Sequence, residues 1–197
     1  ALAAFGGDPD DPGLLELGAL AGSPTARDWG RLANENLPVL RTHDRYGNRL
    51  DEVEFHPAWH ELMTVAVRHG LHAAPWLADD KAAHARRAAG FITWSQAEAG
   101  HGCPISMTYA SIPALRVDAQ RAAEWETGLA SHEYEFGLVP PTQKRGLIAG
   151  MAMTEKQGGS DVRTNSTVAT PVADGYLLTG HKWFCSAPMS DVFLVLA

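Results

Sequence analysis

The sequence predicts an α+β protein in which a helical N-terminal unit, residues 1–142, precedes the start of an antiparallel β-unit, residues 143–197. Two observations predict this class. Apolar residues recur at helical spacing up to about residue 135, and after Pro140 and Pro141 they form short runs and period-two alternations. Helical and strand patterns that are segregated along a chain are typical of α+β folds.

The first helices are predicted from apolar stripes and end signals. Two shorter helices are expected between Pro12 and Asp51, before a turn around residues 46–48. Pro57 suits the first position of a further helix, which Gly70 can end. The apolar stripe of that helix consists of Trp59, Leu62, Met63, Ala66 and Val67.

Three more helices follow in the pattern. Residues 81–99 contain strong helix formers and no proline. This helix would place on a single face Ala88, Phe91, Ile92 and Ser95. Pro104 can open the next helix, which runs toward Pro113, and Asp118 can cap another helix that reaches Leu129.

The β-unit is predicted to form around one hairpin. Residues 146–154 are an apolar run without charge that leads into the polar, glycine-rich residues 155–161. Residues 162–172 alternate with period two, and Asp174-Gly175 is a strong hairpin signal. Residues 176–186 should therefore return antiparallel.

Composition limits the classes of function. The chain has 45% hydrophobic and 20% charged residues, and it contains no apolar run long enough to span a membrane and no secretory signal. We therefore expect a cytoplasmic protein without a membrane partner. The net charge of −7 opposes binding of a nucleic-acid backbone. Cys103 and Cys185 lack the spacing of a zinc site and are expected to be reduced.

The end of the chain predicts a fragment of a longer protein. Residues 192–196 have strand character with both faces apolar, so both faces require cover. No turn or partner strand follows them. We expect later residues to pair with the open edge of this strand.

Two segments carry the candidate chemistry. Residues 151–161 are a strand end and a loop whose hydroxyls, glycines and free N–H groups could hold an anionic or carbonyl-rich ligand, and the alternative is a surface turn. Residues 180–186 would place Trp183 and Phe184 on opposite faces of a strand, so that one side chain could line a pocket. Core packing alone is the alternative for this segment.

The combination of the two segments is more informative than either alone. A Thr-Glu-x-x-Gly-Gly-Ser-Asp loop at residues 154–161, a hairpin, and a Gly-x-Lys-Trp-Phe-x-Ser segment at residues 180–186 together resemble the flavin-binding middle domain of acyl-CoA dehydrogenases. The sequence has no Gly-x-Gly-x-x-Gly after a strand, which argues against a Rossmann-type nucleotide site.

Upstream strings resemble the AidB-like, alkylation-response branch of this family. They are Gly30-Arg-Leu-Ala-Asn-Glu-Asn36, Phe55-His-Pro-Ala-Trp-His60, Cys103-Pro-Ile-Ser-Met107 and Gln143-Lys-Arg-Gly146. With the two later segments, the resemblance covers nearly the whole chain. Single strings are weak evidence, but their order and spacing are specific.

The resemblance implies FAD as the cofactor and assigns residues to its site. The implied cofactor contacts are Met151, Ala152, Met153, Thr154, Gly159, Ser160, Phe184, Cys185, Ser186 and Ala187. Thr154 and Ser160 would also lie near the substrate acyl-CoA, and Ser186 would hydrogen-bond near flavin N5. Two positions depart from the family pattern: Lys156 replaces a common Pro, and Phe184 replaces a frequent Trp.

The implied activity is α,β-dehydrogenation of an acyl-CoA by a homotetramer. The family's catalytic Glu lies in a C-terminal helical domain that this chain lacks, so no catalytic residue is assigned here and the fragment alone should be inactive. The alternative is an AidB-like flavoprotein of the DNA alkylation response, which would contact DNA through a basic C-terminal region outside this chain. A third possibility is a helical scaffold without a bound ligand.

The histidines and remaining acidic residues predict no metal site. His56 and His60 form an i, i+4 pair but lack the intervening Glu pattern of a zinc protease. Glu133 and Glu135 have no matched acid or base partner in the sequence, so we interpret them as solvated charges.

Overall fold

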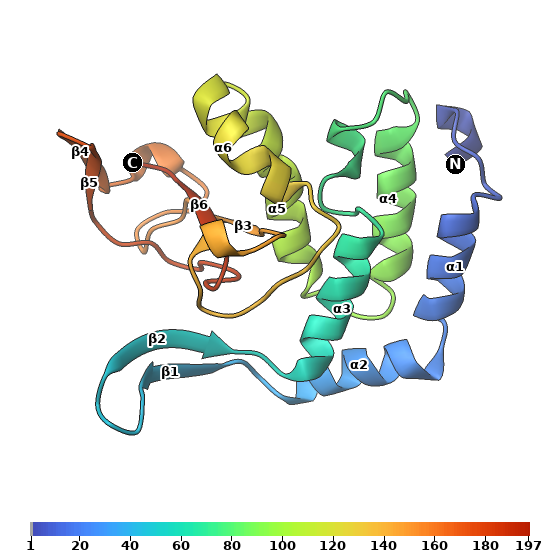
Figure 1. The fold of residues 1–197 in the computed structure, drawn as a ribbon, viewed down its shortest axis with the longest axis horizontal. Helices are drawn as coiled ribbons and strands as arrows, with labels where there is room; N and C mark the ends of the chain where they lie inside the picture. Colours follow the sequence, from blue (N-terminus) through green and yellow to red (C-terminus); the bar gives the residue numbers. More distant parts are fainter. Residues whose placement is uncertain (1) are drawn as a thin grey trace.

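A computed structural model describes residues 2–197, with helices gathered at one end and most strands at the other (Figure 1). The α-helices are α1 (Pro12–Ala21), α2 (Pro24–Glu35), α3 (Pro57–Arg68), α4 (Ala83–Trp94), α5 (Gly102–Leu115) and α6 (Ala119–Leu129). The strands are β1 (Val39–His43), β2 (Arg49–Glu54), β3 (Ala149–Ala152), β4 (Val168–Val172), β5 (Gly175–Thr179) and β6 (Val192–Val195). Short 3-10 turns are η1 (Leu2–Phe5), η2 (Ala74–Trp76), η3 (Pro141–Gln143) and η4 (Val162–Thr164).

Two predicted helix starts, at Pro57 and Asp118, are confirmed by their caps. The helix predicted from Pro104 begins at Gly102 and continues past Pro113 to Leu115, and the helix predicted within residues 81–99 spans Ala83–Trp94. The Asp118 carboxylate accepts hydrogen bonds from the first free N–H groups of α6, as expected for an N-cap. Pro57 opens α3, and His56 caps the same helix through Nδ1, which accepts from the Ala58 N–H at 3.1 Å. Gly70, which has a φ of 67°, follows α3 as predicted.

The helices enclose a core around Trp94, whose side chain is 1% exposed. Its indole N–H donates to the Leu62 carbonyl at 3.1 Å, so the ring is buried without an unsatisfied donor. Ala88 and Ile92, on the face singled out in the sequence, are exposed, and α4 instead buries Gly90 and Trp94. A glycine at 90 lets Leu71 pack against α4, because a Cβ there would lie 2.8 Å from the Leu71 side chain.

The expectation of an all-α unit over residues 1–142 is wrong in one respect. An antiparallel hairpin of β1 and β2 extends from the helices, with its turn at the predicted residues 46–48 (Figure 1). Its strands are largely exposed, so the sequence has no alternation of buried and exposed positions to mark them.

The antiparallel prediction holds for β4 and β5, which pair around the predicted Asp174-Gly175 turn. The pairing of β3 is different. It is parallel to β6, with Ala149 opposite Val192 and Ala152 opposite Val195. Parallel strands need a crossover connection, and the β4–β5 hairpin lies within it.

Two segments expected to be strands are irregular. Residues 162–164 form the 3-10 turn η4 and not the start of a strand, because the Asp161 carboxylate accepts from the Arg163 N–H at 3.2 Å and begins a turn. The returning strand β5 ends at Thr179, so Trp183 and Phe184 do not lie on opposite faces of a strand. Gly180, with a φ of 154°, packs against Thr167 at this bend.

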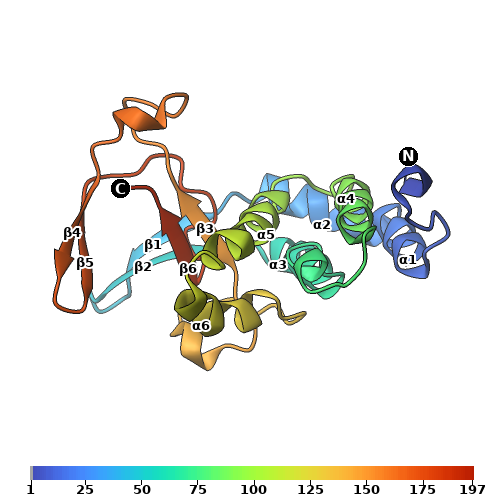
Figure 2. The same ribbon diagram turned by 90° about the horizontal axis from the view of Figure 1, so that it is seen from above.

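The helical and strand regions share buried contacts. Leu147 and Ala149 pack with Leu129 of α6, and the Ala149 N–H donates to the Thr108 hydroxyl of α5 at 3.0 Å. A buried ion pair joins Lys144 to Asp191 at 2.6 Å. These contacts fix β3 and β6 against α5 and α6 (Figure 2). Within residues 2–197, no helix is both long and apolar enough to cross a membrane.

His72 supplies a testable pH dependence. Burial lowers its pKa to about 4, and Nε2 lies 2.9 Å from the Ser131 carbonyl oxygen. In the unfolded chain the His72 imidazole takes up a proton near pH 6.5, whereas in the folded chain it does so only near pH 4. Its contribution to the free energy of unfolding is therefore fully present above pH 6.5 and is lost as the pH falls toward 4. We expect His72 to account for about 3 kcal/mol of this loss. Urea unfolding of the His72→Gln variant should show a flatter pH profile over this window.

The matched control is His43→Gln, since His43 is exposed on β1. Hydrogen bonds from His101 and Gly100 outweigh burial and lower the pKa of Glu98 to about 2, so this carboxylate titrates mainly below the His72 window. An unchanged slope in the His72 variant would contradict the assignment.

Candidate functional site

The end of β3 and residues 181–187 form the candidate site, because direct hydrogen bonds join them. The Trp183 N–H donates to the Thr154 carbonyl at 2.8 Å, and the Lys182 Nζ donates to the Met153 carbonyl at 3.3 Å. The two sequence segments that resembled one family are therefore adjacent in space. They lie beside β3, on the strand-rich side of the molecule (Figure 2).

Glu155 is the buried centre of this site. Its Oε1 accepts from the N–H of Thr167 at 2.9 Å and from its hydroxyl at 2.5 Å. Its Oε2 accepts from the N–H and the hydroxyl of Ser166, each at 2.8 Å. Lys182 Nζ lies 3.0 Å from Oε1, and the Gln157 side-chain amide also donates to Oε2. One carboxylate thus connects the loop after β3, the residues before β4 and the second segment.

The surroundings of Glu155 stabilise its ionised form. The hydrogen bond from the Thr167 hydroxyl, with those from Ser166 and the backbone, holds the pKa of this carboxyl far below its usual range despite burial. Glu155 is therefore ionised and fully occupied by donors, which gives it a structural role and leaves no lone pair free for proton abstraction.

The predicted cofactor residues differ in exposure. Ala152 is buried and Met151 is half-buried in β3. An apolar patch of Met153, Trp183 and Phe184 is open to solvent, with Phe184 82% exposed. The rings of Trp183 and Phe184 are in edge contact at 5.4 Å. Contiguous exposed apolar side chains mark a ligand or protein contact more often than an ordinary surface.

Three of the predicted cofactor residues carry hydroxyl groups. No hydrogen bond joins the hydroxyls of Thr154, Ser160 or Ser186 to another group of residues 2–197. Gly159 lies against Thr154, since a Cβ at 159 would be 3.0 Å from the Thr154 methyl group. An apolar patch with free donors at its edge fits a planar ring that has polar atoms on its rim, as in a flavin.

The backbone at the second segment is strained. Phe184 and Ala187 have φ angles of 57° and 49°, in the left-handed region that non-glycine residues seldom adopt. They flank Cys185 and Ser186. Such conformations cost about 1–3 kcal/mol each and persist where the surrounding structure enforces them, often at ligand sites.

Ser186 and Ala187 also border a pocket shared with the helical region. Its volume is ≈ 270 Å³, and Cys103, Pro104 and His56 also line it. The second segment therefore faces the start of α5, across a space that a ligand of the strand region could enter.

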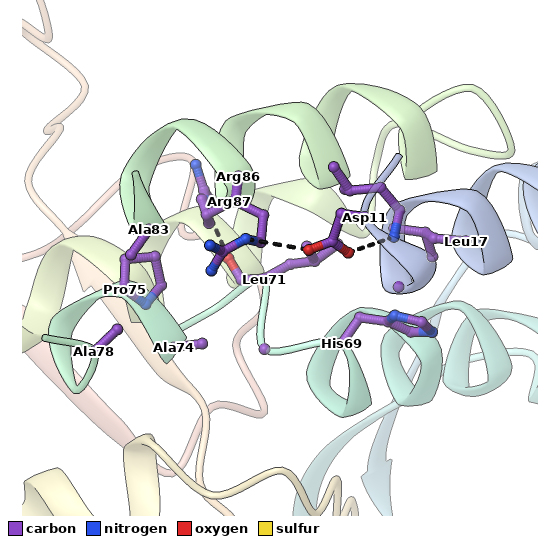
Figure 3. A pocket seen from close by; sticks show the side chains of 13 residues that line it. Asp11, Leu17, His69, Leu71, Ala74, Pro75, Ala78, Ala83, Arg86 and Arg87 are labelled. Atoms are coloured by element: carbon purple, nitrogen blue, oxygen red, sulfur yellow. Dashed lines mark hydrogen bonds and ion pairs between the residues drawn. The ribbon is translucent and has the colours of Figure 1, made fainter. Parts of the chain in front are cut away.

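A smaller pocket near α1 and α4 does not provide a site of this kind. Its volume is ≈ 130 Å³. Figure 3 shows Arg86 directed at Asp11, with Nε 3.3 Å from the carboxylate, and Arg86 also pairs with Asp80. Arg87 donates from Nε to the Leu71 carbonyl at 2.8 Å (Figure 3). Asp11 and Asp80 thus neutralise Arg86, and the Leu71 carbonyl accepts a hydrogen bond from Arg87.

The histidine pair has structural partners. His56 caps α3, and His60 Nδ1 lies 2.9 Å from the Tyr134 hydroxyl. Across residues 2–197, no group of three or more His, Cys, Asp or Glu side chains has the arrangement of a metal site. Glu133 and Glu135 both lie near Arg145, so Arg145 partly neutralises their charge.

Comparison with known proteins assigns the family. Residues 1–136 match the family described as the adaptive response protein AidB N-terminal domain, and residues 150–197 match the acyl-CoA dehydrogenase middle domain. The chain belongs to the AidB-like branch of the acyl-CoA dehydrogenase family. This confirms the resemblance found in the sequence. The boundary at residues 142 and 143 stays a prediction.

Relatives are similar over nearly the whole chain. AidB of Escherichia coli (strain K12) is 47% identical over 95% of this chain and 35% of its own length. Acyl-CoA dehydrogenase family member 11 of Caenorhabditis elegans is 29% identical over 85% of this chain and 27% of its own length. The chain thus spans about a third of the length of these AidB-branch relatives.

Two solved structures share the fold. The apo form of Bd2924 superposes with a TM-score of 0.79 at 30% identity, covering 93% of this chain and 36% of that one. Caenorhabditis elegans ACDH-11, in complex with C11-CoA, has a TM-score of 0.76 at 27% identity, covering 90% of this chain and 30% of that one. The α+β class is therefore confirmed.

The sequence did not predict the buried cluster around the Glu155 carboxylate, which consists of Glu155, Lys182, Ser166 and Thr167. A carboxylate followed by two adjacent hydroxyl residues eleven and twelve positions later is an ordinary sequence. Only the bend at Gly180 and the turn η4 bring these groups together. A signal was present in Lys182, a cation directly before the aromatic residues Trp183 and Phe184, which needs a buried partner if its segment packs.

We predict that Glu155→Gln lowers the thermal unfolding midpoint by about 5 °C or more, because a buried cation loses its partner. Lys182→Met should have an effect of the same sign. A double-mutant cycle followed by circular dichroism measures the coupling between the two side chains.

Glu124→Gln is the matched control, since Glu124 forms an exposed pair with Arg121 on α6. Additive effects of the Glu155 and Lys182 substitutions would contradict the coupling. An unchanged midpoint in Glu155→Gln would remove the carboxylate from the structural centre.

Proposed function

We propose that this chain is part of an FAD-dependent oxidoreductase that introduces a double bond between the α and β carbons of an acyl-CoA. The observation that carries the proposal is the exposed apolar patch of Met153, Trp183 and Phe184, in two hydrogen-bonded segments that also carry the hydroxyls of Thr154 and Ser186. The two segments that form it are those that define the family's flavin-binding domain.

The side chains of the site have distinct roles in this proposal. Met153 and Phe184 would pack against the isoalloxazine ring and exclude water from one face. The hydroxyls of Thr154 and Ser186 would donate to polar atoms of the ring, and the Glu155–Lys182 pair would keep the two segments at a fixed separation. When bound, FAD supplies the acceptor for the hydride that leaves the β carbon.

The substrate class is supported by one related structure. ACDH-11 of Caenorhabditis elegans was solved in complex with C11-CoA. We extend acyl-CoA binding to this protein and place the thioester near Thr154 and Ser160. The cytoplasmic location and the homotetramer that the resemblance implies stay predictions.

We assign no residue of this chain as the base that removes the α proton. Glu155 is occupied by donors, and Glu135 accepts two hydrogen bonds from Arg145. Residues 1–197 give no support to the alternative role in the DNA alkylation response, since their net charge is −7 and its DNA contact was expected in a region outside this chain.

The first prediction is that the protein binds FAD and that Ser186→Ala weakens binding. Loss of one hydroxyl donor to a ring acceptor should cost about 1–3 kcal/mol. Titration of FAD followed by quenching of flavin fluorescence gives the dissociation constant. Ser95→Ala, at the end of α4, is the matched control. Equal affinity in the Ser186 variant would exclude its hydroxyl from the site, and no binding by the unaltered protein would overturn the proposal.

The second prediction concerns residues 1–197 alone. Without an assigned base, this chain loaded with FAD should not oxidise a short acyl-CoA such as isovaleryl-CoA. Anaerobic mixing tests this directly, because reduction bleaches the flavin absorbance. Bleaching at a rate dependent on acyl-CoA concentration would contradict the prediction and require a base among Glu133, Glu135 and Glu155.

A further inference from the structure

A second unassigned feature is a pocket of ≈ 380 Å³ beside α3, here called the aromatic pocket. Its walls are the end of β2, the first two turns of α3, and residues 134–137 and 187–191. Small-molecule sites in proteins commonly enclose about 300–1,000 Å³, so the aromatic pocket is large enough for a compact organic ligand.

Aromatic rings line this pocket and hold one another in place. Phe55 and Trp59 are stacked with their centroids 4.1 Å apart. His60 and Phe136 form a second stack at 3.7 Å, and Tyr134 is hydrogen-bonded to His60. These contacts fix the rings before any ligand arrives, which reduces the conformational entropy lost on binding.

All the charged residues that line the aromatic pocket are acidic. Its charged residues are Glu52, Glu54, Glu61, Glu135 and Asp191, and no Lys or Arg side chain of the described residues is part of the wall. Three of these carboxylates pair with bases outside the pocket, namely Arg41, Arg145 and Lys144.

The other two carboxylates determine which ligand suits the pocket. Glu52 and Glu61 form no ion pair with any residue in the range 2–197. His60 does not offset them, because burial lowers its pKa and keeps the imidazole neutral at physiological pH. The aromatic pocket therefore combines an apolar interior with uncompensated negative charge.

We propose that the aromatic pocket binds an organic cation with an apolar body, such as an alkyl or aryl ammonium ion. The aromatic rings attract a cation through their quadrupoles, and the carboxylates at the rim add Coulomb attraction. The same rim repels carboxylates and phosphates, so neither an acyl anion nor a CoA phosphate suits this pocket. A neutral apolar ligand would gain burial but would leave Glu52 and Glu61 without a counter-charge.

This site does not depend on the proposed flavin chemistry. Phe55, Trp59, Pro104 and Ala187 also line the pocket beside Ser186, but His60, Tyr134 and Phe136 line only the aromatic pocket. Binding of a cation can therefore be measured with or without FAD, and its outcome is separate from that of the FAD titration.

The probe is benzyltrimethylammonium, titrated into the protein by calorimetry. Benzyl alcohol keeps the ring without the charge, and phenylacetate reverses the charge. We expect saturable binding of the cation, affinity at least about tenfold lower for benzyl alcohol, and none for phenylacetate. Equal binding of the alcohol and the cation, or absence of saturable cation binding, would overturn the proposal.

A double variant, Glu52→Gln with Glu61→Gln, removes the charge and keeps the shape of both side chains. It should weaken cation binding by about tenfold and leave benzyl alcohol binding unchanged. Glu124→Gln on α6 is the matched control. The variant should fold, because Glu61 is exposed and Glu52 is half-buried without an ion pair in residues 2–197. Unchanged cation affinity would refute the role of the rim.

Location is tested independently by nuclear magnetic resonance. The indole N–H signal of Trp59 should shift on addition of benzyltrimethylammonium, whereas that of Trp125 on α6 should not. Each signal is assigned from the spectrum of the corresponding Trp→Phe variant. Shifts confined to Trp125 or to other indoles would place the cation elsewhere and reject the aromatic pocket.

Discussion

The carboxylate of Glu155 is the constraint on which the strand region depends. Three segments meet at this buried side chain, and none of them is held there by a sheet of its own. The hydroxyls and N–H groups of Ser166 and Thr167 fix the approach to β4, and Lys182 fixes the segment after β5. Because a charge that is buried without partners is costly, each donor is required by the others.

This constraint explains why the second segment is not a strand. Thr167 is drawn toward Glu155, and Gly180 must pass close to Thr167, where a Cβ would lie 2.5 Å from the hydroxyl oxygen. The chain therefore leaves the β4–β5 ladder at residue 180 and continues with left-handed residues at 184 and 187. Exposure of Phe184 follows from this path and not from any local preference of its sequence.

Much of the helical region could be predicted, because its helices have caps and one buried stripe. Asp118 and Pro57 marked helix starts that the structure confirms. Residues 81–99 were more difficult, since alanines lie on every face and the buried face is the one where Gly90 meets Leu71. The β1–β2 hairpin escaped prediction because both of its faces are largely exposed.

The sequence predicted the motifs of the candidate site but not how their side chains are arranged in space. Thr154 and Ser186 were found from the family pattern, and a hydrogen bond from Trp183 to Thr154 joins the two segments that carry them. Their contacts with a cofactor stay predictions. The Glu155 cluster joins residues up to 27 positions apart, so no local window contains it. The sign of the charge around Trp59 and Phe136 was also invisible, because the glutamates of the aromatic pocket come from three separate segments.

The parallel pairing of β3 with β6 has a consequence for biosynthesis. As the chain leaves the ribosome, β3 emerges well before β6, while the β4–β5 hairpin between them can close locally within microseconds. The apolar strand β3 therefore stays unpaired until the residues after Asp191 have been synthesised. A nascent chain stalled in that interval would expose an unpaired apolar strand beside a folded helical unit. Chaperones recognise intermediates of this kind.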